Sequence, residues 1–189
     1  MKRFFLALLG IVTAAVVAMP TASYAEFDPI TGQEYGSGFG GSSPVKRRVV
    51  DFDTQYPKGS IIVKTGEKRL YLVLGDGKAL RYGVGVGRPG FKWYGSHRIS
   101  RKEEWPGWTP PAQMRKRVPN LPAYMPGGPA NPLGARAMYI GSTLYRIHGS
   151  NEPWTIGGEV SSGCIRMTNN DVKDLYERVR VGARVIVTR

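Results

Sequence analysis

Residues 60–87 constrain the fold more than any other part of the chain. The stretch reads SIIVKTGEKRLYLVLGDGKALRYGVGVG and contains three apolar runs rich in β-branched side chains. The segments TGEK and GDGK separate these runs, and Gly66, Gly75 and Gly77 supply the positive φ angles that tight turns require. Consecutive β-hairpins are therefore predicted here.

Further strands are predicted downstream. RAMYIG and TLYRIHG, within residues 136–149, are typical of a second pair of strands that turns at Gly141 and Ser142. ARVIVTR, residues 183–189, is typical of a short final strand. The chain is therefore predicted to form one mostly β domain, a sandwich or barrel with a few short helices.

One helix is clearly marked near the C-terminus. Four apolar residues recur at the i, i+3, i+4 and i+7 spacing of a single helix face: Val172, Leu175, Tyr176 and Val179. Asn169 or Asn170 is expected to cap the helix, and Asp171 lies in the first turn, where the helix dipole favours an acid.

The N-terminus has the pattern of a secretory signal peptide. Lys2 and Arg3 precede an apolar run over residues 4–18, and the small residues of SYA end at Ala25. The run is shorter than the roughly 20 residues of a membrane span, although an uncleaved anchor remains the alternative. Residues 1–25 are expected to be removed, which predicts an exported protein of the periplasm or cell wall that is peripheral to the membrane at most.

The mature chain is expected to begin with a flexible leader. Residues 26–55 include GQEYGSGFGGSS, which is rich in Gly and Ser and poor in aliphatic side chains, so it cannot offset its ordering entropy. Residues 56–189 are assigned to a single folded domain. A single cysteine rules out internal disulfides, so a packed core must stabilise this domain.

The chain is strongly basic. It holds 27 Lys and Arg residues against 14 Asp and Glu residues, a formal net charge of +13. Such a surface favours polyanionic surroundings, such as an acidic envelope polymer. The basic residues are scattered, with short clusters only at 46–48 and 115–117, and no helix carries a basic stripe. Binding to nucleic acid is therefore not expected.

Residues 88–133 differ in composition from the rest. They hold nine of the fourteen prolines and three of the four tryptophans, with little periodicity, and such long irregular stretches are usually functional or disordered. Their aromatic side chains are costly to leave in water, which disfavours disorder. We therefore expect a partly ordered excursion that walls a groove, with a cap over one end of the core as the alternative.

Cys164 is the candidate nucleophile. It is the only cysteine and lies in SSGCIRM, although a lone cysteine can also be a small buried hydrophobe. A thiolate needs a nearby base or positive charge. His148, sixteen residues earlier at a strand end, is the candidate base, and Arg166 adds a positive charge. We expect this pairing to make Cys164 more acidic than an ordinary thiol.

Glycines lie beside both candidate residues. Gly163 allows a sharp turn, and the amides of Gly163 and Cys164 are candidate oxyanion donors. Gly149 lets substrate or backbone approach the imidazole of His148 closely. One cysteine and two histidines leave too few ligands for a metal site, and no cofactor is expected.

HGSNEPWTIGGEVSSGCIRM, residues 148–167, resembles the signature of the L,D-transpeptidase (YkuD-type) catalytic domain family. IIVKTGEKRLYLV and YGVGVGRPG resemble the first hairpins of that family, and NPLGARAMYIG resembles the strand before its catalytic histidine. The resemblance covers roughly residues 58–188. It implies a β-rich domain that exchanges peptide bonds in peptidoglycan stem peptides.

The resemblance also implies residue roles. Cys164 forms a thioester with loss of D-Ala, and His148 activates it. The amides of Gly163 and Cys164 form the oxyanion hole, and Ser161 fixes the loop. Arg166 holds a substrate carboxylate or orders the loop. The acyl acceptor is an amine of a second stem or of an envelope protein.

Two departures from the family pattern concern substrate details. Ser162 stands where many members have His, so activation depends on His148, and Ser162 can only support the loop by hydrogen bonding. The Thr-Pro-x-Gly turn of many members is replaced by a segment that contains His97, expected to be an exposed loop residue. Trp154 is expected to line the substrate groove or to pack.

Four alternatives differ in class. The same site could hydrolyse the thioester and act as an L,D-carboxypeptidase, or the chain could be a wall-binding module without chemistry. A papain-type peptidase is disfavoured because its cysteine precedes its histidine. A sortase-like enzyme has a histidine much further upstream than sixteen residues.

Overall fold

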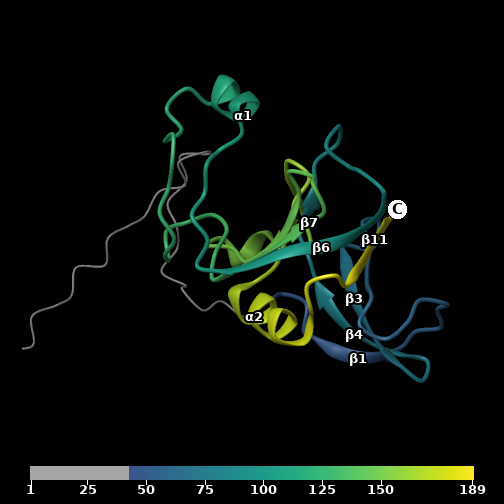
Figure 1. Cartoon of the computed structure of the whole chain (residues 1–189). Helices are drawn as coiled ribbons and strands as arrows, with labels where there is room; N and C mark the ends of the chain where they lie inside the picture. The colour runs from purple at the N-terminus through teal and green to yellow at the C-terminus, as the bar shows by residue number, and fades with distance from the viewer. Residues whose placement is uncertain (1–42) are drawn as a thin grey trace, which may run out of the picture.

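The computed structural model describes residues 43–189. The predicted signal peptide and most of the predicted leader lie outside the described residues. Strands of two to ten residues dominate, and two α-helices and one 3-10 helix interrupt them (Figure 1). None of the helices formed by residues 43–189 is long and apolar enough to cross a membrane.

The elements follow one another along the chain as a run of strands with few helical insertions. They are β1 (Arg48–Asp51), β2 (Ile61–Lys64), β3 (Arg69–Gly75), β4 (Lys78–Gly83), β5 (Val86–Gly87), β6 (Gly95–Glu104), α1 (Ala112–Arg117), β7 (Arg136–Ile140), β8 (Arg146–His148), the 3-10 helix η1 (Pro153–Thr155), β9 (Glu159–Ser161), β10 (Ile165–Arg166), α2 (Asn169–Arg178) and β11 (Arg184–Thr188).

Nine strands form one mixed sheet in the order β1-β4-β3-β2-β11-β6-β7-β8-β10. β2, β3 and β4 pair antiparallel, which confirms the hairpins predicted in residues 60–87. β7 and β8 are the second predicted pair and turn at Gly141 with a φ of 54°. The final strand, β11, lies parallel to β2 and antiparallel to β6, so it joins the two halves of the sheet.

The strand β1 changes the predicted domain boundary. Its residues fall inside the predicted leader, yet they pair antiparallel with β4 from Arg48↔Arg81 to Asp51↔Lys78. Phe52, just after β1, stacks on Tyr71 with ring centroids 4.5 Å apart. The folded domain therefore begins before residue 56, because the backbone of β1 completes the edge of the sheet.

The strand β6 was not predicted. It lies between β11 and β7, near the middle of the sheet, within the segment assigned to an irregular excursion. Its sequence is GSHRISRKEE, and only Ile99 is buried. The strand pattern of apolar alternation is therefore absent, and pairing on both edges fixes its conformation instead.

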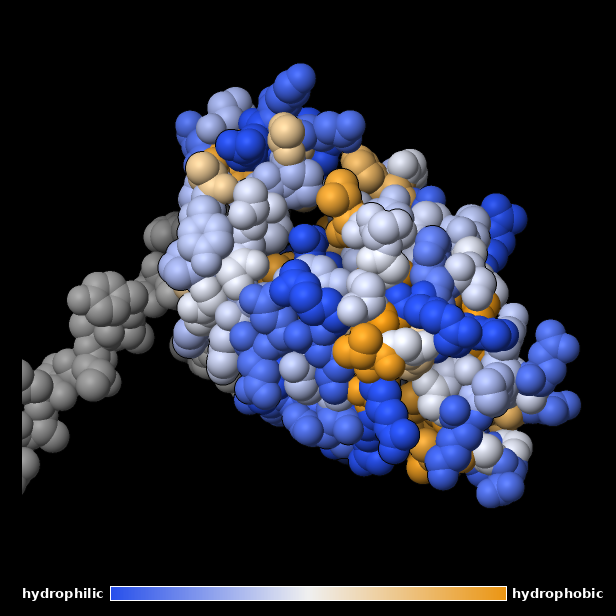
Figure 2. All heavy atoms as spheres, in the orientation of Figure 1, coloured by the Kyte–Doolittle hydropathy of each residue, from blue (hydrophilic) through white to orange (hydrophobic). Residues whose placement is uncertain are grey.

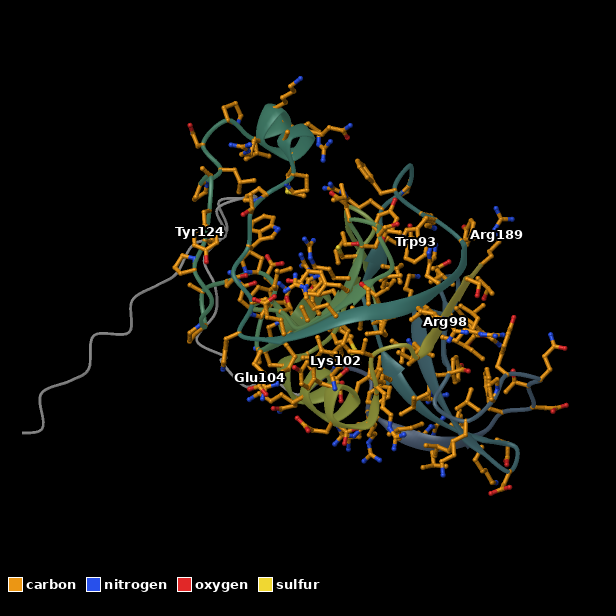
Figure 3. All side chains as sticks on the ribbon, in the orientation of Figure 1. Trp93, Arg98, Lys102, Glu104, Tyr124 and Arg189 are labelled. Atoms are coloured by element: carbon orange, nitrogen blue, oxygen red, sulfur yellow. The ribbon has the colours of Figure 1, made fainter. Side chains whose placement is uncertain are left out.

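One core cluster takes apolar side chains from both halves of the sheet and from α2. Val172, Leu175 and Val179 are buried in it, as the predicted helix face requires, and Tyr176 packs against it in part. Lys102 on β6 reaches the C-terminal end of α2. Its Nζ donates to the carbonyls of Tyr176 at 2.5 Å and Val179 at 2.8 Å (Figure 3).

The cap of α2 differs from the prediction. Thr168 is the N-cap residue, and its Oγ1 accepts from the amide of Asp171 at 3.2 Å. Asn169 instead accepts with its Oδ1 from the amides of Ala135 at 2.9 Å and Ser150 at 3.3 Å. It therefore ties the helix to the segments on either side of β7 and β8.

Beyond β6, the excursion has a small core of its own. Trp108, Leu121 and Leu133 are buried together and are separate from the main core. Backbone bonds of 2.8 Å join Trp108 and Met125 in both directions. α1 lies at the outer end of the excursion (Figure 1), and Figure 2 shows the surface hollowed between it and the sheet. The separate core and the hollow support the prediction that the excursion walls a groove, rather than the alternative of a cap over the main core.

Candidate active site

The short strands β8 and β10 bring the candidate residues together. They pair in parallel, with Ile147 opposite Ile165 and Arg166 opposite His148. Both isoleucines are buried in the core. Side chains alternate between the two faces of a strand, so the neighbours of these isoleucines share the opposite face. That face carries Arg146, His148, Arg166 and, one residue before β10, Cys164.

The imidazole of His148 is fixed in one tautomer. Its side chain is buried, and Nδ1 lies 2.6 Å from the carbonyl oxygen of Gly149. A carbonyl oxygen can only accept a hydrogen bond, so Nδ1 carries the proton in the neutral ring. Nε2 is then left unprotonated and can accept a proton.

The structure reverses the expected acidity of the thiol. Burial raises the pKa of Cys164 above its ordinary value, although Arg146 and Arg166 oppose the rise. Burial and the Arg166 guanidinium lower the pKa of His148 to about 3. In the resting state both Cys164 and His148 are therefore neutral, and the prediction of an unusually acidic cysteine was wrong because it ignored desolvation.

Arg146 is the site residue that sequence reasoning missed. Of the positive charges that lower the pKa of Cys164, the charge of Arg146 has the largest effect. Its guanidinium lies 5.1 Å from the ring centroid of Tyr139, and its Nη1 donates to the carbonyl of Leu144 at 3.1 Å. The sulfur of Cys164 lies 3.9 Å from the same carbonyl oxygen. Arg146 and Cys164 therefore meet at Leu144.

The hydroxyl of Ser161 fixes the loop that carries Cys164. It donates to the carbonyl oxygen of Cys164 at 2.6 Å and accepts from the amide of Gly163 at 3.1 Å. The loop-fixing role expected of Ser161 agrees with this geometry. The Gly163 amide already donates to Ser161, however, so it does not match its expected role as an oxyanion donor. Of the two predicted oxyanion donors, only the Cys164 amide remains.

Gly163 has no room for a side chain. Its φ is 112°, and an added Cβ would overlap the ring of Tyr145. That ring stacks on the indole of Trp93, with centroids 4.5 Å apart and planes 3° apart. The indole Nε1 donates to the carbonyl of Gly163 at 2.7 Å. The segment that was expected to wall a groove therefore holds the turn before Cys164.

The excursion contacts this loop from a second direction. Arg117 at the end of α1 lies over the ring of Phe91, with Cζ 5.3 Å from the centroid. Arg88 lies over the same ring at 5.4 Å, and its Nη2 donates to Ser162 Oγ at 3.3 Å. Ser162 thus accepts a hydrogen bond from the excursion, which fits the loop-supporting role predicted for it.

Arg166 does not present a free charge to substrate. Its Nη1 pairs with Glu152 Oε2 and lies 3.3 Å from Thr155 Oγ1. The two charged side chains are only 13% and 12% exposed, so the pair is largely shielded from water. Of the two roles considered for Arg166, ordering the loop between His148 and Cys164 fits this contact, and binding a substrate carboxylate does not.

Gly149 is required for close packing of protein backbone. An added Cβ would overlap Asn169 Oδ1 and would lie 3.0 Å from the amide of Ala135. Because protein atoms fill this space, no room remains there for substrate.

Two further residues complete the comparison with the sequence. Trp154 in η1 is 50% exposed, which leaves its ring available to a substrate. His97 was predicted to be an exposed loop residue, and this prediction was wrong. His97 lies on β6, is half-buried, and packs edge-on against Trp93 with ring centroids 5.7 Å apart. Within residues 43–189, no cluster of three or more His, Cys, Asp or Glu side chains could hold a metal ion.

The chain belongs to the L,D-transpeptidase catalytic domain family, YkuD, whose model matches residues 58–187. The family resemblance of the sequence is thereby confirmed. The probable L,D-transpeptidase ErfK/SrfK of Escherichia coli K12 is 42% identical over 134 residues, 66% of this chain and 42% of that protein. The probable L,D-transpeptidase YbiS of the same strain is 41% identical over 134 residues, 66% of this chain and 43% of that protein. The matches thus span less than half the length of these relatives.

Solved structures have the same fold. A crystal structure from Brucella melitensis, which bears the name probable carnitine operon oxidoreductase caia, is 41% identical with a TM-score of 0.53 and covers 80% of this chain and 99% of its own. An L,D-transpeptidase from Mycobacterium tuberculosis H37Rv is 19% identical with a TM-score of 0.53, covering 69% and 57%. At that identity the likeness shows the fold alone, and it confirms the mostly β prediction.

Proposed function

We propose that this protein is a peptidoglycan L,D-transpeptidase that uses Cys164 as its nucleophile. The observation that carries the proposal is the fixed tautomer of His148, because the bond from Nδ1 to Gly149 leaves Nε2 as a base on the face that carries Cys164. The substrate is the tetrapeptide stem, at the bond between its third residue and the terminal D-Ala. The family and the named relatives support this substrate class.

The first half-reaction forms a thioester. The sulfur of Cys164 attacks the carbonyl carbon while its proton passes to His148 Nε2, so no stable thiolate is needed beforehand. Negative charge develops on the carbonyl oxygen, and the Cys164 amide stabilises it. The C–N bond then breaks, and the imidazolium of His148 gives its proton to the leaving amine of D-Ala.

The second half-reaction transfers the acyl group. An acceptor amine attacks the thioester, its proton passes to His148 Nε2, and the sulfur leaves and takes the proton back as a thiol. A thioester retains acyl energy, so this exchange of one amide for another needs no ATP. The acceptor is a second stem or an envelope protein, and attack by water would instead give an L,D-carboxypeptidase. Export to the periplasm or cell wall would place the enzyme with its substrate.

The proposal is tested with purified tetrapeptide-stem muropeptides. Mass spectrometry of protein and products should detect an acyl adduct on Cys164 and released D-Ala. Cross-linked dimers would identify stem-to-stem transfer, and tripeptides would identify hydrolysis. Cys164→Ala should lose the adduct and all turnover while its circular dichroism stays unchanged. Full activity in Cys164→Ala would refute the cysteine mechanism, and a folded wild-type protein without adduct or product would favour a wall-binding module.

A further inference from the structure

A basic cavity lies away from Cys164, at the C-terminal end of α2. The loop before β2, the start of β6 and the turn between α2 and β11 enclose about 640 Å³. The strands β2, β11 and β6 are neighbours in the sheet, and β7 separates β6 from β8 and β10. Five basic residues line the cavity and no acidic residue does: Lys58, Arg98, Arg178, Arg180 and Arg184.

Most of this positive charge is uncompensated. Arg178 forms two hydrogen bonds of 3.0 Å to the carboxylate of Asp174, which also lies 3.4 Å from Arg47 and so compensates part of the Arg178 charge. Among residues 43–189, no carboxylate lies within the 4.0 Å ion-pair distance of the four other basic side chains, which are Lys58, Arg98, Arg180 and Arg184. All four are exposed. The cavity therefore concentrates positive charge on one small area.

Two of these arginines are forced together by the sheet. Arg98 on β6 is directly opposite Arg184 on β11 in the antiparallel register. Like charges at directly opposed positions destabilise a strand pair. Arg98 lies on the face in view in Figure 3, and strongly hydrophilic residues gather there around an apolar spot in Figure 2. An anion bound between the two guanidinium groups would remove the repulsion.

We propose that this cavity binds a phosphate group of high charge, such as an oligophosphate or the phosphorylated headgroup of a lipid. Arginine favours phosphate because its planar group makes paired hydrogen bonds to two oxygens. The volume lies within the range of roughly 300–1,000 Å³ of small-ligand sites. Val181, which is 59% exposed, borders the cavity and offers an apolar contact to the body of such a ligand. The inference does not depend on the proposed acyl transfer.

Calorimetric titration with inorganic tripolyphosphate at low ionic strength tests the proposal. One saturable site is expected, with affinity that falls as salt is added. The double variant Arg98→Ser/Arg184→Ser should bind at least about tenfold more weakly, since it removes two paired contacts. The matched control Arg115→Ser/Lys116→Ser removes equal charge from exposed positions on α1 and should keep the affinity. Equal losses in both variants, or no saturable binding, would overturn the proposal.

Vesicles distinguish the source of the phosphate. Co-sedimentation with vesicles that contain a lipid with two phosphates, abolished in the Arg98/Arg184 variant, would assign the cavity to a headgroup. Tripolyphosphate binding without vesicle binding would assign it to a soluble ligand. Transpeptidation on muropeptides should be unaffected in the double variant, so failure here is separable from failure of the proposed enzyme activity.

Discussion

At the scale of single residues, Arg146 and Trp93 define the site as much as the predicted pair does. Burial raises the pKa of the Cys164 thiol, and Arg146 is the main charge that opposes it. Trp93 holds the carbonyl of Gly163, immediately before Cys164. Arg146 affects how readily the sulfur of Cys164 loses its proton, and Trp93 fixes the position of the turn before it.

Arg146→Met should raise the pKa of the Cys164 thiol further, because the thiolate loses the positive charge that stabilises it most. A rise of one unit would slow iodoacetamide alkylation at fixed pH about tenfold. The measurement is the alkylation rate between pH 6 and 10, with Lys116→Met as a control for loss of charge elsewhere. Superimposed profiles for Arg146→Met and wild type would show that Arg146 only packs.

Trp93→Phe keeps an aromatic ring against Tyr145 but loses the Nε1 donor. The fold should lose about 1 kcal/mol of unfolding free energy, the usual contribution of one hydrogen bond. Turnover should fall more than this loss explains, since the turn before Cys164 loses its support. Steady-state rates beside urea unfolding measure both effects. If kcat were unchanged, the bond from Trp93 would have no role in positioning.

At the scale of elements, α2 is held at both ends by residues outside its predicted face. Thr168 accepts from the amide of Asp171 at the start of the helix. Lys102 donates to the last carbonyls, where the helix dipole favours a positive charge. Because Asn169 binds the amides of Ala135 and Ser150, the helix also supports the segment that follows His148.

Thr168→Ala should cost about 1 kcal/mol of unfolding free energy, because the amide of Asp171 loses its acceptor. Asn170→Ala is the matched control, since Asn170 is exposed and was the alternative cap in the sequence. Urea unfolding of the two variants shows which residue, Thr168 or Asn170, caps the helix. A larger loss in Asn170→Ala than in Thr168→Ala would contradict the cap observed here.

At the scale of the whole molecule, the candidate active site draws on two strands at one end of the sheet and on the excursion. β8 and β10 bring together the candidate nucleophile and base, and the segment from Arg88 to Trp93 supports the loop before Cys164. The basic cavity is lined from β6, β11 and the loop before β2. One sheet thus carries both the candidate active site and this cavity.

Burial of neutral His148 should make the stability of the whole domain depend on pH. The pKa of His148 falls from 6.5 in the unfolded chain to about 3 in the folded domain. Between these values only the unfolded state binds the proton, so unfolding becomes easier as the pH falls below 6.5. The loss is about 1.4 kcal/mol per pH unit.

Urea unfolding of wild type and His148→Asn at pH 7.0, 5.5 and 4.5 measures this effect. The difference between the two proteins isolates His148 from the other titrating groups. Wild type should lose stability faster toward acid than His148→Asn does. Parallel curves would show that His148 is not buried in its neutral form.

Local patterns in the chain determined the hairpins of residues 60–87, the apolar face of α2, and Cys164 and His148 as candidates. Turn glycines, apolar spacing and residue chemistry act over a few residues, so a single sequence is enough to read them. The alternation in YRIHG also carried a signal for Arg146, which lies two residues before His148 and therefore on the same strand face.

Tertiary structure alone decided the rest. β6 is a strand because β11 and β7 pair with it, although only Ile99 among its residues is buried. The ion pair of Arg166 with Glu152 joins residues fourteen positions apart through a loop whose course no local pattern gives. The raised pKa of the Cys164 thiol comes from burial, and burial is a property of the packed molecule, because it depends on atoms that many distant segments supply.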